Sequence, residues 1–221
     1  MKALDRRLHA YRADLADARL RNQFNAASYV DGKPGHIICG TAVLRSVPDD
    51  KCPIDSELLY GENISIFERK DGWAWVQAET DRYVGYIKES TIATKLADPT
   101  HYVTTLRTFI YPEPNLKAPP LHLISMNSPL QLTEKEHTGF RLLEEGGWVV
   151  AGHLSKFGNQ DNDPCEIALQ FDGTPYLWGG RTSLGLDCSA LVQMSLLRCG
   201  IKVPRDSDMQ EKVIARPTTC Q

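Results

Sequence analysis

The chain has 221 residues, of which 42% are hydrophobic, and this length allows one large domain or two to three small ones with buried cores. Its formal net charge is -3, and Lys and Arg are interspersed among Asp and Glu. Because no basic stripe is present to neutralise a nucleic-acid backbone, we expect no nucleic-acid partner.

The N-terminus carries charges throughout and lacks the apolar run and small residues of a secretory signal. No stretch approaches the roughly 20 apolar residues that a membrane span requires. The sequence therefore predicts a cytoplasmic chain with reduced thiols and no membrane partner. The six cysteines form no CxxC pair and no zinc-ligand spacing, so we expect no metal and no other cofactor.

Residues 1–36 are predicted to form an N-terminal helix and a linker. Apolar residues recur at steps of three and four over residues 2–20, which is the spacing of a one-sided helix: Leu4, Leu8, Tyr11, Leu15 and Ala18. Residues 21–36 are polar and irregular, and the run Asp31-Gly32-Lys33-Pro34-Gly35 is typical of a loop.

Two small β domains are predicted next, over residues 37–97 and 98–157. Strand-like runs separated by turn residues occupy 40–47, 58–68, 73–79 and 83–88 in the first, and 104–111, 129–134, 140–143 and 148–153 in the second. The turn and strand at 71–76 are echoed at 145–150, which indicates tandem copies of one module. Prolines cannot occupy a central strand, so Pro112 to Pro120 should be an extended loop.

The last part, residues 158–221, becomes helical. Residues 155–165 read as a linker, and a short helix should follow Pro164 and stop at Asp172-Gly173. A second, buried helix is predicted over 188–199, with Asp187 as its N-terminal cap and Gly200 just past its end.

Cys188 opens this second helix, where unpaired backbone N–H groups and the helix dipole stabilise an anion. A thiolate is the nucleophilic form of cysteine, and helix N-termini favour it. From the residues alone, a cysteine that begins an apolar helix is more often structural than catalytic.

Three motifs in order resemble the signature of the NlpC/P60 family of papain-like cysteine peptidases. They are Pro175-Tyr176-Leu177-Trp178-Gly179-Gly180-Arg181, Gly185-Leu186-Asp187-Cys188-Ser189-Ala190-Leu191-Val192, and Val203-Pro204-Arg205-Asp206-Ser207-Asp208-Met209-Gln210. The two β domains resemble the bacterial SH3 domains that precede the catalytic domain in several branches of this family. The resemblance implies a mainly β plus α+β fold: two SH3-like β-barrels followed by the N-terminal part of a papain-like NlpC/P60 domain.

The resemblance also assigns roles to motif residues. It implies that Cys188 is the nucleophile, that it attacks a γ-D-glutamyl–diamino acid bond in a murein peptide of the L-Ala-γ-D-Glu-diaminopimelate type, and that the Tyr176 hydroxyl helps to hold the oxyanion. Asp187 would receive the free amine of the peptide. Ser189, Asp206 and Ser207 match positions near the D-glutamate carboxylate. Without the motif, Tyr176 reads as a core aromatic and Asp187 as a plain helix cap.

The family's first SH3 module lines one end of the substrate pocket. Glu62 and Tyr83 resemble the residues that form this wall. An exposed turn glutamate and a half-buried strand tyrosine explain these two positions equally well.

A papain-like site also needs a histidine that takes up and returns the thiol proton. All six histidines precede Cys188, and the 33 residues after it contain none. The sequence therefore predicts a truncated chain that lacks its general base and is inactive alone, since losing such a base costs roughly 10²–10⁴ in rate. The competing interpretation is a non-catalytic product or a module that binds cell-wall peptides. The oligomeric state is not set by the sequence.

Overall fold

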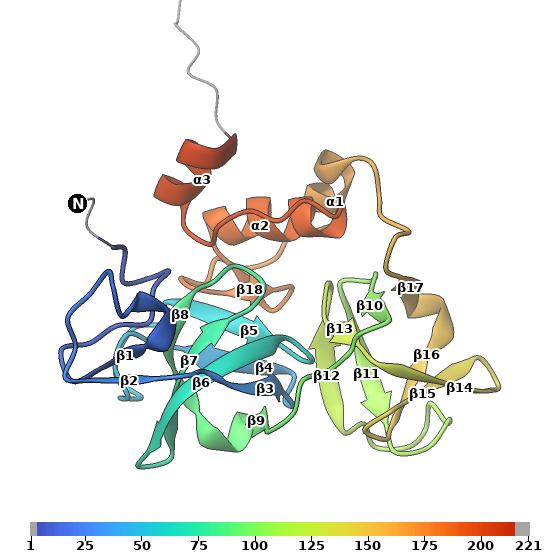
Figure 1. Cartoon of the computed structure of the whole chain (residues 1–221). Coiled ribbons are helices and arrows are strands. Elements are labelled where there is room, and N and C mark those ends of the chain that lie inside the picture. The colour runs from blue at the N-terminus through green and yellow to red at the C-terminus, as the bar shows by residue number, and fades with distance from the viewer. Residues whose placement is uncertain (1–3, 215–221) are drawn as a thin grey trace, which may run out of the picture.

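The computed structural model describes residues 4–214 as two β modules side by side, with a layer of helices across one end of both (Figure 1). We call strands β3 to β9 the first module, strands β10 to β17 the second module, and residues 164–214 the helical segment. None of the described helices is long and apolar enough to cross a membrane.

The first module combines a five-stranded antiparallel sheet, in the order β8-β7-β6-β3-β9, with the hairpin β4–β5. Its strands are β3 (Lys33–Ile37), β4 (Thr41–Leu44), β5 (Ser56–Leu59), β6 (Asn63–Lys70), β7 (Trp73–Ala78), β8 (Val84–Lys88) and β9 (Ile92–Ala93). Alternate strand residues such as Ile64, Val76 and Ile87 point inward and form the core. The four predicted strand regions are confirmed, although residues 58–68 contain the end of β5, a turn and most of β6.

The second module repeats this plan, with one sheet ordered β12-β11-β16-β15-β14 and another ordered β13-β10-β17. Its strands are β10 (His101–Val103), β11 (Arg107–Tyr111), β12 (His122–Ser125), β13 (Pro129–Leu130), β14 (Leu132–His137), β15 (Phe140–Leu143), β16 (Trp148–Val150) and β17 (Leu154–Lys156). The proline-rich stretch is a loop between β11 and β12, as predicted. The sequence pattern missed β10, β12 and β17, which have only three or four residues each.

The predicted N-terminal helix is wrong. Within residues 4–32 the structure has β1 (Leu15–Asp17), a 3-10 turn at Ala18–Leu20 and β2 (Ser28–Val30), and β1 pairs with β2 in parallel. Backbone groups that a helix would bond internally are bonded to the first module instead: Gln77 donates its amide N–H to the Leu8 carbonyl at 2.7 Å. A short segment gains more from such tertiary contacts than from its helical spacing.

The predicted linker is also wrong at its end, because β3 begins at Lys33 inside the expected loop. Gly35 explains how this strand fits: a Cβ atom there would lie 2.7 Å from the Ile66 side chain and 2.8 Å from the Ala93 carbonyl oxygen. The strand can therefore pack closely between β6 and β9 only because residue 35 has no side chain.

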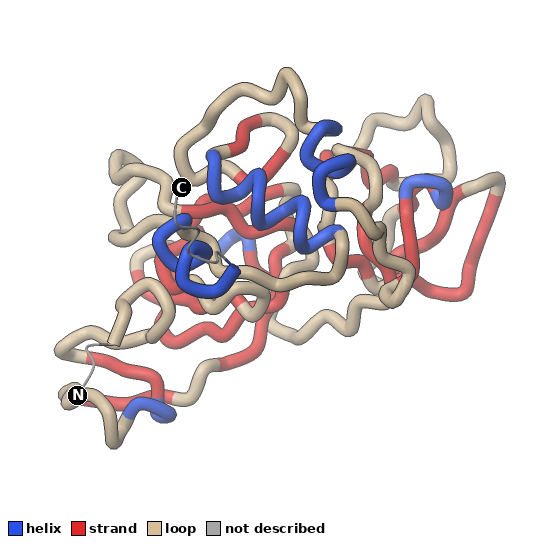
Figure 2. The backbone as a smooth tube through the Cα atoms, turned by 90° about the horizontal axis from the view of Figure 1, so that it is seen from above, coloured by secondary structure: helices blue, strands red, loops and turns tan. Residues whose placement is uncertain are grey.

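The helical segment contains α1 (Pro164–Gln170), β18 (Arg181–Thr182), β19 (Gly185–Leu186), α2 (Cys188–Arg198) and α3 (Ser207–Ile214). Seen from above, the helices lie over the strands (Figure 2). A shared core joins α2, through Ala190 and Met194, to Leu59 of the first module and Met126 of the second. This core fixes the start of α2 relative to both modules. The predicted helices correspond to α1 and α2, whereas α3 was not predicted.

Candidate active site

Cys188 is the first residue of α2, and its side chain is exposed. Asp187 caps this helix as predicted, since its carboxylate accepts from the Ala190 N–H at 2.8 Å. Gly200 follows the helix end with a φ of 77°, which suits a residue without a side chain. The thiol therefore lies at the open N-terminus of a helix whose other residues are anchored in the shared core.

The Asp187 carboxylate also takes part in an ion pair that the sequence did not predict. It forms a buried ion pair with Arg205, with the guanidinium nitrogens 2.6 and 3.0 Å from its two oxygens. It also accepts from the Gly179 N–H at 2.9 Å. Burial raises the pKa of Asp187, but the Arg205 bonds outweigh this effect and the net pKa is lowered. Asp187 is thus held as a carboxylate, with both oxygens already bonded.

Ser189 lies in the same cluster, and its hydroxyl donates to Asp187 at 3.1 Å and accepts from Arg205 at 2.8 Å. Arg205 itself is 1% exposed and also donates to the Ser56 hydroxyl of the first module at 3.0 Å. The structure therefore brings Asp187 and Ser189 together directly beneath the nucleophile. Arg205 was missed as a functional residue, although it lies inside the third sequence motif.

Tyr176 lies beside the nucleophile, on a strand-like stretch that forms a parallel bridge with Leu186. Its side chain is 64% exposed, which rules out the core aromatic alternative. Loss of hydration, followed by the negative charges at Cys188 and Asp187, raises the pKa of the Tyr176 hydroxyl. The hydroxyl is therefore held in its protonated, hydrogen-donating form close to the thiol.

Tyr83 and Asp206 meet across the boundary between the first module and the helical segment. The Tyr83 hydroxyl donates to Asp206 Oδ2 at 3.1 Å. Burial, and then the charges of Asp206 and Asp55, raise the pKa of Tyr83. Ser207 follows as the exposed first residue of α3. The structure therefore brings Tyr83 next to Asp206, which Ser207 follows in the chain, and the roles of these residues in substrate binding stay predictions.

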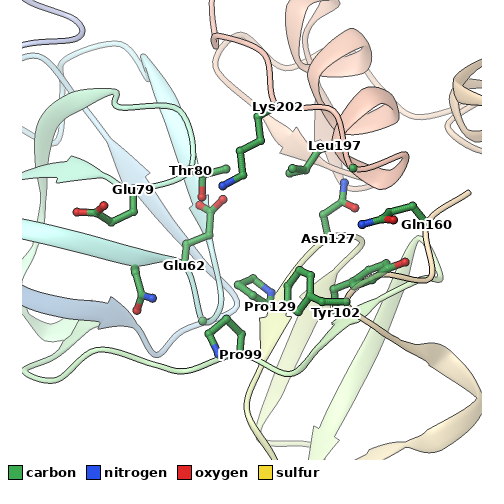
Figure 3. A pocket seen from close by; sticks show the side chains of 14 residues that line it. Glu62, Glu79, Thr80, Pro99, Tyr102, Asn127, Pro129, Gln160, Leu197 and Lys202 are labelled. Atoms are coloured by element: carbon green, nitrogen blue, oxygen red, sulfur yellow. The ribbon is translucent and has the colours of Figure 1, made fainter.

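Glu62 is not brought to this cluster. It is 3% exposed, and its two oxygens each lie 3.1 Å from a guanidinium nitrogen of the fully buried Arg181. Glu62 also lines a cavity of about 290 Å³ between the two modules and the C-terminal end of α2 (Figure 3), where Lys202 points toward it. Cys188 and Tyr83 do not line this cavity, so the role of Glu62 in the substrate wall stays a prediction.

The histidines all have partners or neighbours elsewhere in the described residues. His36 and His153 bond to Glu145 and Thr108, His101 bonds to Thr100, His9 bonds to the Asp5 carbonyl, and His122 and His137 pack against Tyr60 and Trp148. Among residues 4–214 no group of three or more His, Cys, Asp or Glu side chains could hold a metal ion. The described site therefore offers a thiol, a phenol and an arginine-balanced carboxylate.

Comparisons with known proteins match two segments of this chain. Residues 44–92 match the family model described as the bacterial dipeptidyl-peptidase SH3 domain, and residues 173–219 match the NlpC/P60 family. The chain is 25% identical over 72% of its length to a "Gamma-D-glutamyl-L-lysine dipeptidyl-peptidase" of Bacillus cereus, and the match covers 54% of that protein. It is 24% identical over 79% of its length to "Dipeptidyl-peptidase 6" of Lysinibacillus sphaericus, covering 73% of that protein.

A crystal structure of an NlpC/P60 family protein from Bacillus cereus has the same fold, with a TM-score of 0.69 at 21% identity over 81% of this chain and 76% of the other. The chain spans about half the length of the first of these relatives. The two family matches and the shared fold agree on the organisation of the chain: a segment similar to the bacterial dipeptidyl-peptidase SH3 domain precedes a segment similar to the NlpC/P60 family.

Proposed function

We propose that this chain supplies the nucleophile and part of the peptide-binding surface of a cysteine peptidase. Its substrate would be a peptidoglycan-derived peptide of the L-Ala-γ-D-Glu-diaminopimelate type, cut at the γ-D-glutamyl bond. The observation that carries the proposal is the exposed Cys188 thiol at the start of α2, with Tyr176 beside it. The names of the two dipeptidyl-peptidase relatives support the substrate class.

In the proposed reaction the Cys188 thiolate adds to the carbonyl carbon of the γ-D-glutamyl bond. The carbonyl oxygen becomes an oxyanion, and the protonated Tyr176 hydroxyl donates a hydrogen bond to it. The C–N bond then breaks, the amine of the diamino acid leaves with a proton, and water hydrolyses the thioester to restore the thiol. Asp187 and Arg205 keep the start of α2 in place throughout, because their ion pair is buried directly behind it.

We further propose that residues 1–221 alone do not complete this reaction. The amine must leave with a proton, and each of the six histidines bonds to or packs against a residue other than Cys188. The competing function is a module that binds the peptide without cutting it. Binding is expected under both functions, so cleavage and thiol reactivity must be measured separately.

The decisive experiment uses a peptide that reports the nucleophile without needing a general base. L-Ala-γ-D-Glu carrying a chloromethyl ketone in place of the scissile amide should alkylate Cys188 by direct displacement of chloride, as located by mass mapping of proteolytic peptides. The same electrophile on L-Ala-α-L-Glu should label at least about tenfold more slowly, a difference of about 1.4 kcal/mol. Cys165 is the internal control, because its thiol is also exposed. Equal labelling of both thiols, or by both isomers, would refute the proposed site.

A second experiment tests completeness. The chain is incubated with L-Ala-γ-D-Glu-diaminopimelate, and release of diaminopimelate is followed against a Cys188→Ala control. No release is expected. Release that is lost in the control would mean that a base acts on Cys188 from within residues 1–221.

A further inference from the structure

The N-terminal segment, for which the sequence predicted only a helix and a linker, contacts Asp206 of the proposed substrate site through Arg7. Its backbone is docked beside Tyr83, since the Val84 N–H of β8 donates to the Arg7 carbonyl oxygen at 2.8 Å. Leu8 is held in the same way by the Gln77 amide. The Arg7 side chain therefore starts from a fixed point at the edge of the first module and extends toward α3.

The Arg7 guanidinium uses all of its hydrogen-bond donors on three carboxylates. An arginine side chain has five N–H donors in a planar fork. Here Nε and Nη2 donate to Asp5 at 3.1 and 2.8 Å, Nη1 donates to Asp206 and Asp208 at 2.8 Å each, and Nη2 donates to Asp208 at 2.9 Å. A fully bonded fork cannot rotate without breaking several charge-assisted bonds at once. Arg7 thus fixes the position of the first turn of α3.

Asp206 is the residue on which this arrangement acts. Its Oδ2 atom accepts from both Arg7 and Tyr83, at 2.8 and 3.1 Å. Its other oxygen, Oδ1, accepts no hydrogen bond from any described residue, and the side chain is 25% exposed. One oxygen is therefore held from two sides, while the other is left without a partner in the described residues on a partly exposed side chain.

The negative charges around Asp206 also need the positive charge of Arg7 to balance them. Asp206 and Asp208 flank the first residue of α3, and Asp55 lies close enough for the charge of Asp206 to add to burial in raising the pKa of the Asp55 carboxyl. Without Arg7 these carboxylates would repel one another and any substrate carboxylate. The Arg7 bonds act in the opposite direction on Asp208 and lower its pKa to about 2.

We infer that Arg7 is a positioning residue for the substrate peptide: it holds Asp206 against Tyr83 so that the free Asp206 oxygen can accept a hydrogen bond from the peptide. This inference rests on the proposed function for the location of the substrate. The alternative is a clasp that ties α3 to the first module and has no effect on the peptide.

The test measures peptide affinity in the Cys188→Ala chain, so that no turnover occurs. Calorimetry with L-Ala-γ-D-Glu-diaminopimelate compares Arg7→Ala, Arg7→Lys and Asp208→Asn in that background. Asp208→Asn is the matched control, because it weakens the grip of Arg7 on α3 and leaves the bond to Asp206 intact. We expect Arg7→Ala to bind about tenfold more weakly, which is about 1.4 kcal/mol. Arg7→Lys should recover part of this loss, since lysine keeps the charge but not the fork. Asp208→Asn should stay within about twofold of its parent.

Equal peptide affinity of Arg7→Ala and its parent would overturn the inference. A loss of affinity in Asp208→Asn as large as that in Arg7→Ala would also overturn it. Either result would mean that Arg7 only ties α3 to the first module. If Arg7→Ala does not fold, Arg7→Lys decides, with a loss of about threefold expected and no loss refuting it. Failure of the proposed function looks different: the Cys188→Ala parent then binds no peptide, and the unmutated chain shows no isomer-selective labelling of Cys188. In that case the inference about Arg7 falls with it.

Discussion

Glu62→Gln tests whether the buried pair between Glu62 and Arg181 joins the first module to the segment that carries the nucleophile. Arg181 is 0% exposed and lies on β18, and Glu62 follows β5 of the first module. Burial alone would lower the pKa of Arg181, but the carboxylates of Glu62, Asp81 and Glu57 outweigh burial and raise it, so the guanidinium stays charged. Removing the charge of Glu62 leaves that cation without its main partner.

The magnitude follows from burial. Breaking one side of a buried ion pair costs about 3–5 kcal/mol, because the remaining charge has lost both water and its partner. With a slope of about 2–3 kcal/mol/M in urea, the unfolding midpoint of Glu62→Gln should fall by about 1–2.5 M. The assay is equilibrium urea unfolding followed by tryptophan fluorescence, which the four tryptophans of the chain report: three lie in the two modules and Trp178 lies in the helical segment.

The control replaces both partners, as Glu62→Leu with Arg181→Met. A buried pair replaced by apolar side chains of similar volume is often neutral or stabilising, so the double variant should recover most of the loss. A Glu62→Gln loss below about 1 kcal/mol would refute the reasoning, because it would place the pair in the range of exposed ion pairs.

Three further predictions concern the site itself. The pKa of Asp208 is lowered from an ordinary 3.8 to about 2, so its ionised carboxylate stabilises the fold above about pH 4 and this stabilisation is lost as the pH falls through 2. In Asp208→Asn the midpoint temperature of thermal unfolding should therefore depend less on pH in this acid range. Asp187→Asn keeps an oxygen that can cap α2 but leaves the buried Arg205 without its counter-charge, so the free energy of unfolding measured in urea should fall by about 3–5 kcal/mol. A fall of only about 1 kcal/mol would mean that Asp187 acts as a helix cap alone. Iodoacetamide should modify Cys188 faster than Cys165, which is also exposed, since the carboxylate next to Cys188 is balanced by Arg205. Equal rates in peptide mapping would contradict this.

Local sequence patterns predicted the parts of the fold that depend on local rules. Alternating residues and turn glycines located most strands, and Asp187 with Gly200 located both ends of α2. The same reasoning failed for residues 2–20, where the apolar spacing of a helix is present but the backbone bonds to β7 and β8 instead. The conformation of this segment depends on contacts with strands that are distant in the sequence, and the spacing of apolar residues carries no information about such contacts.

The candidate site divides in the same way. Cys188, Tyr176 and Asp187 lie within one short stretch, and the motif identified them with no need for a structure. The arginines that balance the site carboxylates were not identified, because their partners are remote: Arg7 bonds to Asp206 across 199 positions, and Arg181 bonds to Glu62 across 119. Arg181 ends the first sequence motif, but nothing in the local sequence shows that Arg181 or Arg7 is paired with a remote carboxylate.

The three arginines Arg7, Arg181 and Arg205 share one geometric role. Each connects the helical segment to the first module or its N-terminal extension: Arg181 through Glu62, Arg205 through Ser56 and Arg7 through Asp206. Apolar contacts such as those of the shared core tolerate sliding, whereas a guanidinium hydrogen bond is directional, and the link from Arg181 to Glu62 is bidentate. The position of Cys188 relative to Tyr83 therefore depends on directional bonds between segments, and a change in any of the three arginines should alter peptide binding even where the hydrophobic core remains intact.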